Sequence, residues 1–363
     1  MKTYSDDLVQ RLSQAHETLN VNGVTVRVKP MPDERRPGYL EAREIQMMVE
    51  AQAAGTAGFR PNMTLNDMRE MMGFPNRNLN TVEIHTRYEE HRFGENLVKL
   101  WIHWPRKPEG KKNHPCLIYL HGGGWIGGSV FTVENPCRLI AELADAVVVN
   151  VDYNLAPERP YPNGFNDCYA VLSHIHAHAA DYGIDRERIA MAGDSAGGNL
   201  TAACALRDRD EGTGMLKLQI LIYPAVTLAE TTKGYTFDVS AYDIAPEHRD
   251  LILPAVMALA SGGVSPMTAM YLAGDAKLTT SPYVSPLCAE RFDDLPPALI
   301  VTPEFDGLRL QGEAYAKALK DAGVAVDLIR YKGQMHAFLD KLGVIPQAED
   351  LVIEMSKAIQ AMR

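Results

Sequence analysis

Residues 193–197 have the sequence GDSAG and fit the pattern G-x-S-x-G, which holds the nucleophilic serine of many hydrolases. The pattern requires a sharp turn from a strand into a helix, so that the serine hydroxyl is exposed on a strained backbone. The apolar run RIAMA precedes the turn and a helical sequence follows it. A helix that begins just after the serine favours developing negative charge at this point. These features predict Ser195 as the nucleophile of an acyl-transfer reaction.

A serine nucleophile needs a general base. In hydrolases built on this turn, the acid and then the histidine follow the serine along the chain. The histidines that follow Ser195 are His248 and His336. His248 lies in a polar helical stretch, where we expect it to be solvated. His336 follows the last apolar run, where a loop can carry it over the edge of a sheet, so we predict His336 as the base.

The acid that orients the histidine should follow the apolar run at residues 298–303. Glu304 and Asp306 both stand there. Asp306 lies further past the run and beside Gly307, where the chain can turn, so we predict Asp306 as the acid. Glu304 is the alternative acid, or else it makes a structural hydrogen bond beneath the site.

Residues 121–128, HGGGWIGG, allow two interpretations. They contain G-x-G-x-x-G, the pattern of dinucleotide-binding loops, and also H-G-G-G, the pattern of a loop that supplies N–H groups to an oxyanion. A dinucleotide site expects an acidic residue about 20 positions further on. Asp152 ends the next apolar run, but it lies 30 residues beyond Gly122. The oxyanion interpretation also accounts for the serine, the acid and the histidine, so we favour it.

Apolar runs alternate with helical stretches from residue 81 onward, which predicts an α/β fold with helices on both faces of a mostly parallel sheet. Two stretches of alternating polarity, expected to be half-buried strands, come first. We expect a central sheet of about eight strands. The stretches are 81–90, 96–105, 115–120, 146–151, 188–193, 218–223, 298–303 and 325–331.

Residues 1–80 differ from the rest, because their clearest patterns are helical, at residues 39–55 and 64–73. Thr64 and Asp67 resemble a capping box at the start of the second helix. Five methionines fall between positions 47 and 72. We expect residues 1–80 to form a helical cap segment and residues 81–363 to form the catalytic domain. A cap insertion at about 226–280 would contain a helix disturbed by Pro254.

The chain has 363 residues and a net charge of −10, which argues against nucleic acid and anionic membranes as partners. Its N-terminus lacks the apolar core of a signal peptide, and no apolar run approaches the ~18 residues of a membrane span. We therefore expect a cytoplasmic protein. The five cysteines form no C-x-x-C pair and are expected to be free thiols. A solvated helix, rather than a metal site, is expected for His174, His176 and His178.

Over roughly residues 81–363, the chain resembles the bacterial branch of the hormone-sensitive lipase family of α/β-hydrolases. The matching stretches are HGGGW, VDYNLAPERPYP, RIAMAGDSAGGNL, SPYVSPL, FDGLRLQGEAYAKAL and MHAF. The resemblance implies an α/β-hydrolase fold with a helical lid built from the N-terminal segment and the insertion. It implies Ser195 as nucleophile, Asp306 as acid, His336 as base, and oxyanion N–H groups on Gly123, Gly124 and Ala196.

These features together predict a serine carboxylesterase that hydrolyses short-chain esters through an acyl-enzyme, without a metal or an organic cofactor. The alternatives are an amidase or deacetylase on the same scaffold, and a ligand-binding pseudo-enzyme. The resemblance also implies a possible homodimer.

The chain departs from the usual family pattern at four positions. The family usually has Arg, Pro, Glu and Gly where this chain has Asn154, Gly307, Gln311 and Ala337, respectively.

Overall fold

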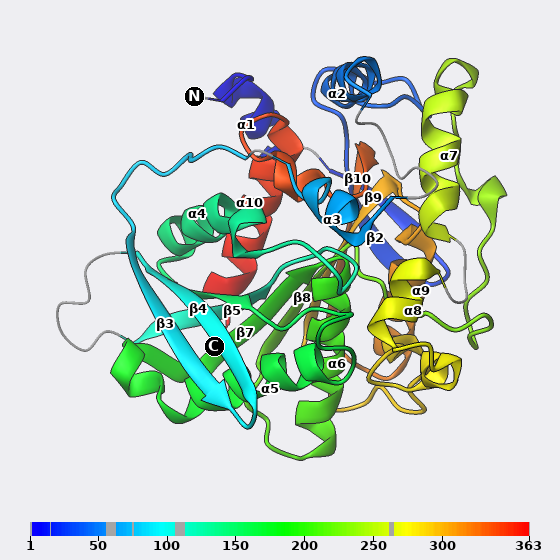
Figure 1. Cartoon of the computed structure of the whole chain (residues 1–363). Coiled ribbons are helices and arrows are strands. Elements are labelled where there is room, and N and C mark those ends of the chain that lie inside the picture. The colour runs from blue at the N-terminus through cyan, green and yellow to red at the C-terminus, as the bar shows by residue number, and fades with distance from the viewer. Residues whose placement is uncertain are drawn as a thin grey trace.

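A computed structural model describes residues 2–14, 16–55, 63–74, 76–105, 113–260 and 265–362 (Figure 1). The strands are β1 (Glu17–Val21), β2 (Val24–Lys29), β3 (His85–Phe93), β4 (Asn96–Trp104), β5 (His114–Leu120), β6 (Val147–Asp152), β7 (Ile184–Asp194), β8 (Leu218–Ile222), β9 (Ala298–Phe305) and β10 (Val326–Met335). The α-helices are α1 (Asp6–Gln14), α2 (Ala42–Ala53), α3 (Leu65–Glu70), α4 (Glu134–Ala144), α5 (Asn163–Ala177), α6 (Ala196–Asp210), α7 (Arg249–Ala260), α8 (Pro266–Tyr271), α9 (Arg309–Asp321) and α10 (Pro346–Gln360).

All the described strands belong to one 10-stranded sheet with the order β1-β2-β10-β9-β8-β7-β5-β6-β4-β3. The seven strands from β2 to β6 in this order are parallel, and β1, β4 and β3 run antiparallel to their neighbours. The α/β fold and the eight predicted strands, β3 to β10, are confirmed. Because the carboxyl ends of parallel strands meet at one edge, the loops that follow β5, β7, β9 and β10 can share a site there.

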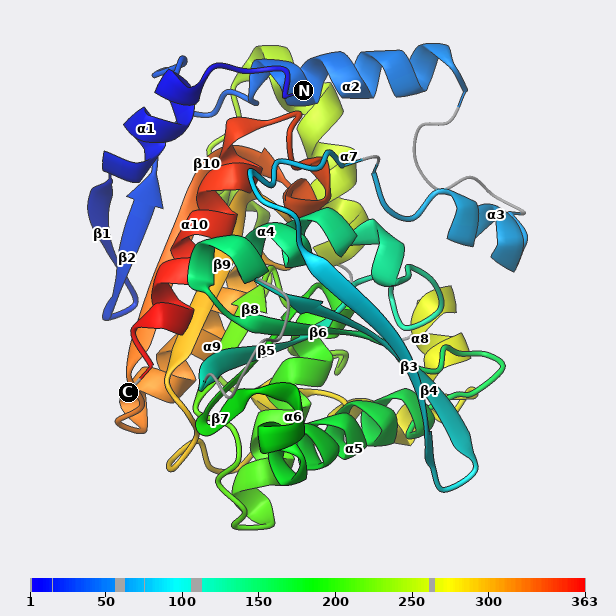
Figure 2. The same cartoon turned by 90° about the vertical axis from the view of Figure 1, so that its left-hand side faces the viewer.

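Helices cover both faces of the sheet, as the near-continuous apolar runs predict (Figure 2). Side chains of α5, α6 and α9 form one core with the sheet, and side chains of α4 and α10 form the other. Four of the five cysteines lie buried in these layers, and all five are free, as expected. None of the described helices is long and apolar enough to cross a membrane.

The N-terminal segment contributes two strands to the sheet, so the prediction of a helical cap segment at 1–80 does not hold for residues 17–29. β1 and β2 form a hairpin, and β2 pairs in parallel with β10. The predicted helices are present as α2 and α3, and α3 begins with the predicted Thr64–Asp67 capping box.

A buried ion-pair network fastens the hairpin to the domain. The Lys29 side chain at the end of β2 is 1% exposed. Its ammonium group donates to the Leu12 carbonyl at 2.9 Å and lies 3.0 Å from Asp350 and 3.1 Å from Glu354, both on α10. A buried charge needs such partners, because an unpaired one is very costly. The β1–β2 hairpin is therefore an integral part of the catalytic sheet.

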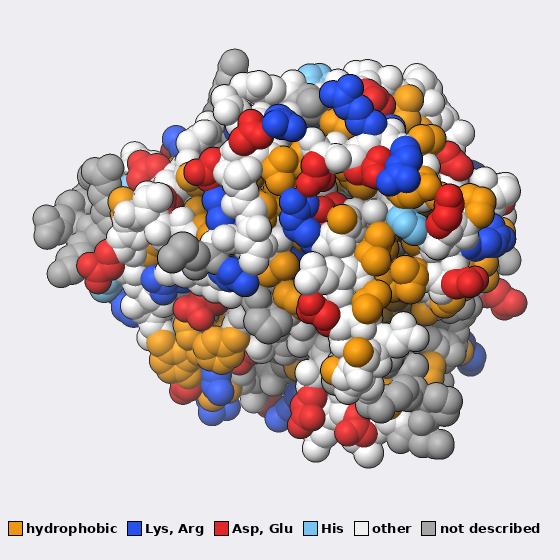
Figure 3. Space-filling view, turned by 90° about the horizontal axis from the view of Figure 1, so that it is seen from above, with side chains coloured by type: hydrophobic (Ala, Val, Ile, Leu, Met, Phe, Trp, Pro, Cys, Tyr) orange, Lys and Arg blue, Asp and Glu red, His pale blue; other side chains and the backbone are white. Residues whose placement is uncertain are grey.

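Helix α2 of the N-terminal segment packs against the insertion. Leu40, next to α2, shares a small apolar core with Ile252 and Val256 of α7, and Met48 of α2 packs against it. Pro254 lies inside α7, as predicted, and the helix continues through it to Ala260. On the face seen from above, hydrophobic side chains form several groups separated by charged ones (Figure 3).

Candidate active site

Ser195 lies at the sharp turn between β7 and α6, as the G-x-S-x-G pattern predicts. Its backbone has φ 55° and ψ −115°, a strained conformation for a residue with a side chain. The flanking glycines are needed because the backbone is crowded here. A Cβ on Gly193 would lie 2.3 Å from the backbone of Gly197, and a Cβ on Gly197 would lie 1.9 Å from the Leu120 carbonyl oxygen. The turn holds the serine hydroxyl at the wall of a pocket.

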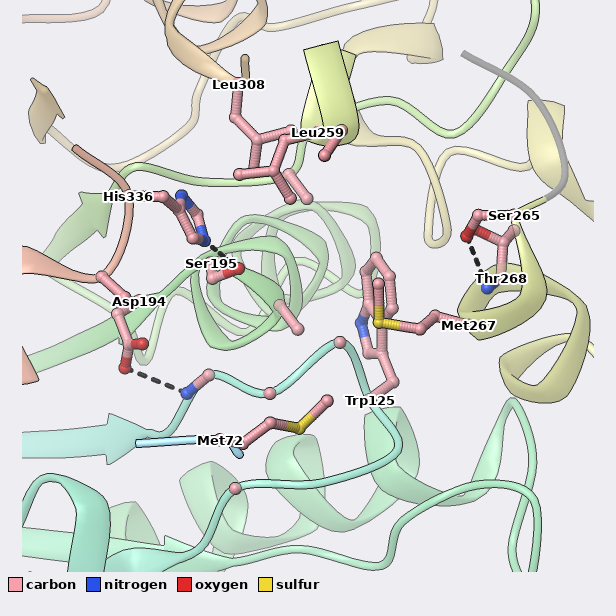
Figure 4. A pocket seen from close by; sticks show the side chains of 18 of the residues that line it. Met72, Trp125, Asp194, Ser195, Leu259, Ser265, Met267, Thr268, Leu308 and His336 are labelled. Atoms are coloured by element: carbon pink, nitrogen blue, oxygen red, sulfur yellow. Dashed lines mark hydrogen bonds between the residues drawn. The ribbon is translucent and has the colours of Figure 1, made fainter. Parts of the chain in front are cut away.

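The structure brings Ser195, His336 and Asp306 together from three separate loops. The His336 Nε2 atom lies 2.9 Å from the Ser195 Oγ (Figure 4), and the Nδ1 atom lies 2.8 Å from Asp306 Oδ2. Asp306 is 1% exposed, and its other oxygen accepts a hydrogen bond from the Leu308 backbone N–H at 2.8 Å. These contacts fix the direction of the imidazole ring, so that Nε2 faces the serine.

Glu304, the alternative acid, bonds to the backbone, and the His336 Nδ1 atom meets Asp306 instead. Its carboxylate accepts a hydrogen bond from the Gly333 N–H at 2.8 Å, which is the structural role the sequence suggested for it. Burial raises the pKa of this carboxyl group. The other candidate base, His248, lies outside the pocket lining. It is half-buried and accepts a hydrogen bond from the Leu40 N–H at 2.9 Å, so it is only partly exposed to solvent.

The glycine-rich loop lies directly beneath the serine. Gly123 and Gly124 have φ 124° and φ 58°, which a residue with a side chain rarely adopts. Both line the same pocket as Ser195 and Ala196. Ala196 is the first residue of α6, so its N–H has no partner within the helix and is free to bind an anion. The predicted oxyanion residues therefore line the same pocket as Ser195.

Asp194 holds this loop in place, a role that the sequence alone did not suggest. Its carboxylate accepts a hydrogen bond from the Gly122 N–H at 3.0 Å (Figure 4) and another from the Tyr119 hydroxyl at 3.1 Å. Burial raises the pKa of Asp194 to about 6. The end of β7 therefore carries Asp194, which anchors the glycine-rich loop, directly before the nucleophile Ser195.

The raised pKa of Asp194 should make the free energy of unfolding depend on pH. We expect the wild-type free energy of unfolding to fall, relative to that of an Asp194→Asn variant, as the pH rises from 4 to 7. The folded-state pKa of about 6 lies above the unfolded-state value of about 3.9, so the folded protein holds the proton more tightly in this window. That stabilisation is lost as the pH rises past the folded-state pKa. Urea unfolding at four pH values would measure the difference, and a constant difference would contradict the prediction.

The cap closes the other sides of the pocket. A Cβ on Gly127 would lie 2.4 Å from the Met72 sulfur, and a Cβ on Gly124 would lie 2.8 Å from the Met267 sulfur, so both methionines rest on the loop (Figure 4). Arg69 on α3 donates to the Ile126 carbonyl at 2.6 Å and pairs with Glu158 at 2.7 Å. The N-terminal segment and the insertion therefore both contact the glycine-rich loop.

Gly307 and Gln311, two of the departures from the family pattern, have clear structural roles. A Cβ on Gly307 would lie 2.3 Å from the Val256 carbonyl oxygen of α7. The glycine therefore lets α7 pack directly against the chain next to Asp306. The Gln311 side-chain oxygen accepts hydrogen bonds from the Val226 and Thr227 N–H groups at 2.7 and 2.9 Å. Both residues hold the insertion against the catalytic domain.

The remaining departures and the histidine group affect the site less. Asn154 donates to Asp167 at 2.8 Å, and Ala337 adopts a left-handed conformation with φ 61° immediately after His336. The rings of His174 and His178 share one helix face with centroids 4.6 Å apart. Within the described residues, no group of three or more His, Cys, Asp or Glu side chains is arranged to hold a metal ion.

Comparisons with known proteins agree with this fold. The α/β-hydrolase fold family matches residues 117–340. The chain is 36% identical over 250 residues to the esterase LipI of Mycobacterium tuberculosis, covering 69% of this chain and 73% of that protein. It is 37% identical over 253 residues to the carboxylesterase NlhH of the same organism, covering 70% and 75%.

A solved structure extends the likeness to most of the chain. The hyperthermophilic esterase from the archaeon Pyrobaculum calidifontis superimposes with a TM-score of 0.73 at 29% sequence identity. The match covers 89% of this chain and 99% of that one. With a serine at the strand-to-helix turn, a histidine and a buried acid aligned behind it, and a glycine-rich loop beneath, the chain belongs to the hormone-sensitive lipase family of the α/β-hydrolases.

Proposed function

We propose that the protein is a serine carboxylesterase that hydrolyses short-chain esters through an acyl-enzyme. The observation that carries the proposal is the chain of hydrogen bonds that links Asp306 to His336 and His336 to the Ser195 Oγ atom. Ser195, at one end of this chain, lines a pocket. A nucleophile within hydrogen-bond reach of a base, which is itself oriented by a third group, is the arrangement that activates serine.

The first half-reaction forms the acyl-enzyme. His336 Nε2 takes the proton from Ser195 while the Oγ atom attacks the ester carbonyl carbon, and the carbonyl oxygen becomes an oxyanion. The tetrahedral intermediate collapses when the C–O bond to the alcohol breaks, and His336 returns the proton to the leaving oxygen. Asp306 keeps the imidazole in the tautomer with hydrogen on Nδ1 and stabilises its charged form.

The oxyanion is stabilised by groups that are already in position. We expect the N–H groups of Gly123, Gly124 and Ala196 to bind the oxyanion, because these residues line the pocket beside Ser195 and the α6 N-terminus adds a favourable dipole. A single such donor contributes roughly 3–4 kcal/mol to the transition state. In the second half-reaction, His336 Nε2 takes a proton from a water molecule that attacks the acyl carbon. The bond between that carbon and Ser195 Oγ then breaks, His336 returns the proton to Oγ, and the carboxylic acid leaves.

The size of the pocket supports short substrates. The cavity has a volume of about 310 Å³, close to the lower end of the roughly 300–1,000 Å³ that ligand pockets span. Met72, Met267 and Leu259 close its sides, and all three come from the cap (Figure 4). Each methylene buried in such a slot contributes ~0.8 kcal/mol until the slot is full. Acyl groups from acetyl to about hexanoyl should therefore be preferred.

A panel of esters of graded acyl length, with one matching amide, tests the proposal on the wild type and on Ser195→Ala. We expect a wild-type kcat/KM that is highest for short acyl chains, with little activity on the amide. An optimum at long-chain triglycerides, or faster cleavage of the amide, would contradict it. Deleting residues 1–80 is a poor test of the cap, because it would also remove β1, β2 and the buried Lys29.

A single substitution in the catalytic domain tests whether α7 limits the length of the acyl chain that the pocket accepts. Gly307→Ala should push α7 outward, because the new Cβ would overlap the helix backbone at Val256 and Ala260. Since Leu259 of α7 lines the cavity, we expect the preferred acyl chain to lengthen and the Tm to fall. The matched control is Gly312→Ala in α9, where the nearest atom to a new Cβ lies 3.3 Å away at a side-chain methyl group. An unchanged acyl profile in Gly307→Ala would show that α7 does not set the limit.

A further inference from the structure

The cap helix α3 carries a side chain that reaches the turn of the glycine-rich loop from outside the pocket. The Arg69 Nε atom donates to the Ile126 carbonyl oxygen at 2.6 Å. The two terminal nitrogens of Arg69 donate to the two carboxylate oxygens of Glu158 at 2.8 and 2.7 Å, and one of them also donates to the Ala156 carbonyl at 3.1 Å. Arg69 does not itself line the active-site cavity. An effect of this arginine on catalysis would therefore act through the loop.

The hydrogen bond from Arg69 continues through the backbone of the loop. The Ile126 carbonyl and the Gly127 N–H belong to one peptide group, and the Gly127 N–H donates to the Gly123 carbonyl at 3.0 Å. The Ile126 N–H donates to the same carbonyl at 3.2 Å. The Gly123 carbonyl shares the next peptide group with the Gly124 N–H. Two peptide groups in series therefore connect the guanidinium of Arg69 to an N–H group that we expect to bind the oxyanion.

The planarity of the peptide group gives this series of bonds a direction. In a trans peptide, the C=O and N–H bonds point in opposite directions. The Gly123 carbonyl is held by the Ile126 and Gly127 N–H groups, so the Gly124 N–H points away from them. Among the described residues, the Gly124 N–H meets no hydrogen-bond acceptor, and Gly124 lines the cavity. This N–H is therefore held in a fixed direction and is free to bind a ligand.

The charge of Arg69 should also strengthen this N–H as a donor. A hydrogen bond from an ionised donor is stronger than one between neutral groups, and hydrogen bonds in series polarise one another. The guanidinium draws electron density toward the Ile126 carbonyl, which makes the Gly127 N–H a stronger donor to Gly123, and the Gly124 N–H gains in the same way. A stronger and better directed donor stabilises an oxyanion more than a neutral carbonyl oxygen, so the gain falls mainly in the transition state.

We propose that Arg69 is a positioning residue of the oxyanion hole and acts on the Gly124 N–H through the two peptide groups Ile126–Gly127 and Gly123–Gly124. The cap would then do more than close the pocket, because the docking of α3 through Arg69 completes the groups that stabilise the oxyanion. This inference rests on the proposed esterase function and on the expected oxyanion role of Gly124.

Arg69→Met tests the inference. It removes the charge and the donors but keeps an unbranched chain beside Gly127, where a Cβ would lie 3.1 Å from the Arg69 Cγ. Two measurements are compared, the hydrolysis of ethyl butyrate and the inhibition constant of 1,1,1-trifluoro-2-hexanone, a ketone whose adduct with Ser195 carries an oxyanion. We expect kcat and inhibitor affinity each to fall by roughly 10- to 30-fold, less than the roughly 10²–10³-fold loss that follows removal of an oxyanion donor itself. The KM for the ester should be nearly unchanged.

The matched control loosens α3 without changing Arg69. Thr64→Val removes the hydroxyl that accepts a hydrogen bond from the Asp67 N–H at 3.2 Å in the capping box. If Arg69 only held the cap helix in place, this variant should show the same losses, whereas we expect its kcat and inhibition constant to stay near the wild-type values. KM and the inhibition constant do not depend on the folded fraction, and titration of active sites with an alkyl phosphonate corrects kcat for it.

The outcomes separate this inference from the proposed function. Unchanged kcat and inhibitor affinity in Arg69→Met, with wild-type hydrolysis that depends on Ser195, would overturn the inference and leave the esterase intact. Equal losses in Thr64→Val, or a change in Arg69→Met that is confined to KM, would overturn it as well. If the wild type neither hydrolyses the ester in a Ser195-dependent manner nor binds the ketone, the proposed function itself fails.

Discussion

Ser195→Ala and His336→Ala should each abolish ester hydrolysis, with kcat lower by a factor of up to roughly 10⁶. Alanine at 195 removes the atom that forms the acyl-enzyme. Alanine at 336 removes the base that lies 2.9 Å from that atom and leaves the serine hydroxyl protonated. The measurement is the initial rate of butyrate ester hydrolysis for each variant at a fixed pH.

The double variant gives this prediction its control. Because Ser195 and His336 act as one unit, the double variant should be little slower than either single variant, and the remaining rate should reflect the oxyanion groups alone. Losses that multiply in the double variant would show that the two residues act in separate steps. Near-wild-type turnover in Ser195→Ala would contradict the mechanism.

Asp306→Asn should be the next most damaging substitution, with kcat lower by roughly 10⁴. The geometry of the site would survive, since asparagine has the same shape. However, the amide would favour the wrong imidazole tautomer, with hydrogen on the nitrogen that faces Ser195. Steady-state kinetics over a range of ester concentrations would show the loss in kcat.

Glu304→Gln is the matched comparison, because Glu304 also ends β9 but bonds to the Gly333 N–H instead of to His336. The glutamine oxygen can accept the same hydrogen bond, so we expect only a small change in kcat. If Glu304→Gln were the more damaging of the two substitutions, the acid would have to be assigned to Glu304.

The core of the fold could be predicted from the sequence because its signals are local. The apolar runs of β5 to β9 and the turn at Ser195 each show in a few consecutive residues. The β1–β2 hairpin was missed although the sequence VTVRVK of β2 alternates in polarity. Its strand state depends on pairing with β10, about 300 residues later, and on the ion pairs of Lys29 with α10. Such partners are not visible in a local pattern.

The same distinction holds within the site. Order along the chain and position after each strand were enough to bring Ser195, His336 and Asp306 to one place. The anchoring by Asp194 and the packing of α7 on Gly307 depend on residues distant in the sequence. Asp194 stands inside the recognised GDSAG pattern, but the pattern does not say that its carboxylate faces Gly122.

The central claim is that Ser195 is the nucleophile, and covalent labelling tests it most directly. An alkyl phosphonate with a good leaving group should react with the wild type once per chain, and activity should fall in proportion to the label. Mass spectrometry of the digested protein should place the phosphonyl group on Ser195, while Ser195→Ala and His336→Ala should remain unlabelled. A label on another residue, or full ester hydrolysis by a protein that takes up no label, would contradict the account.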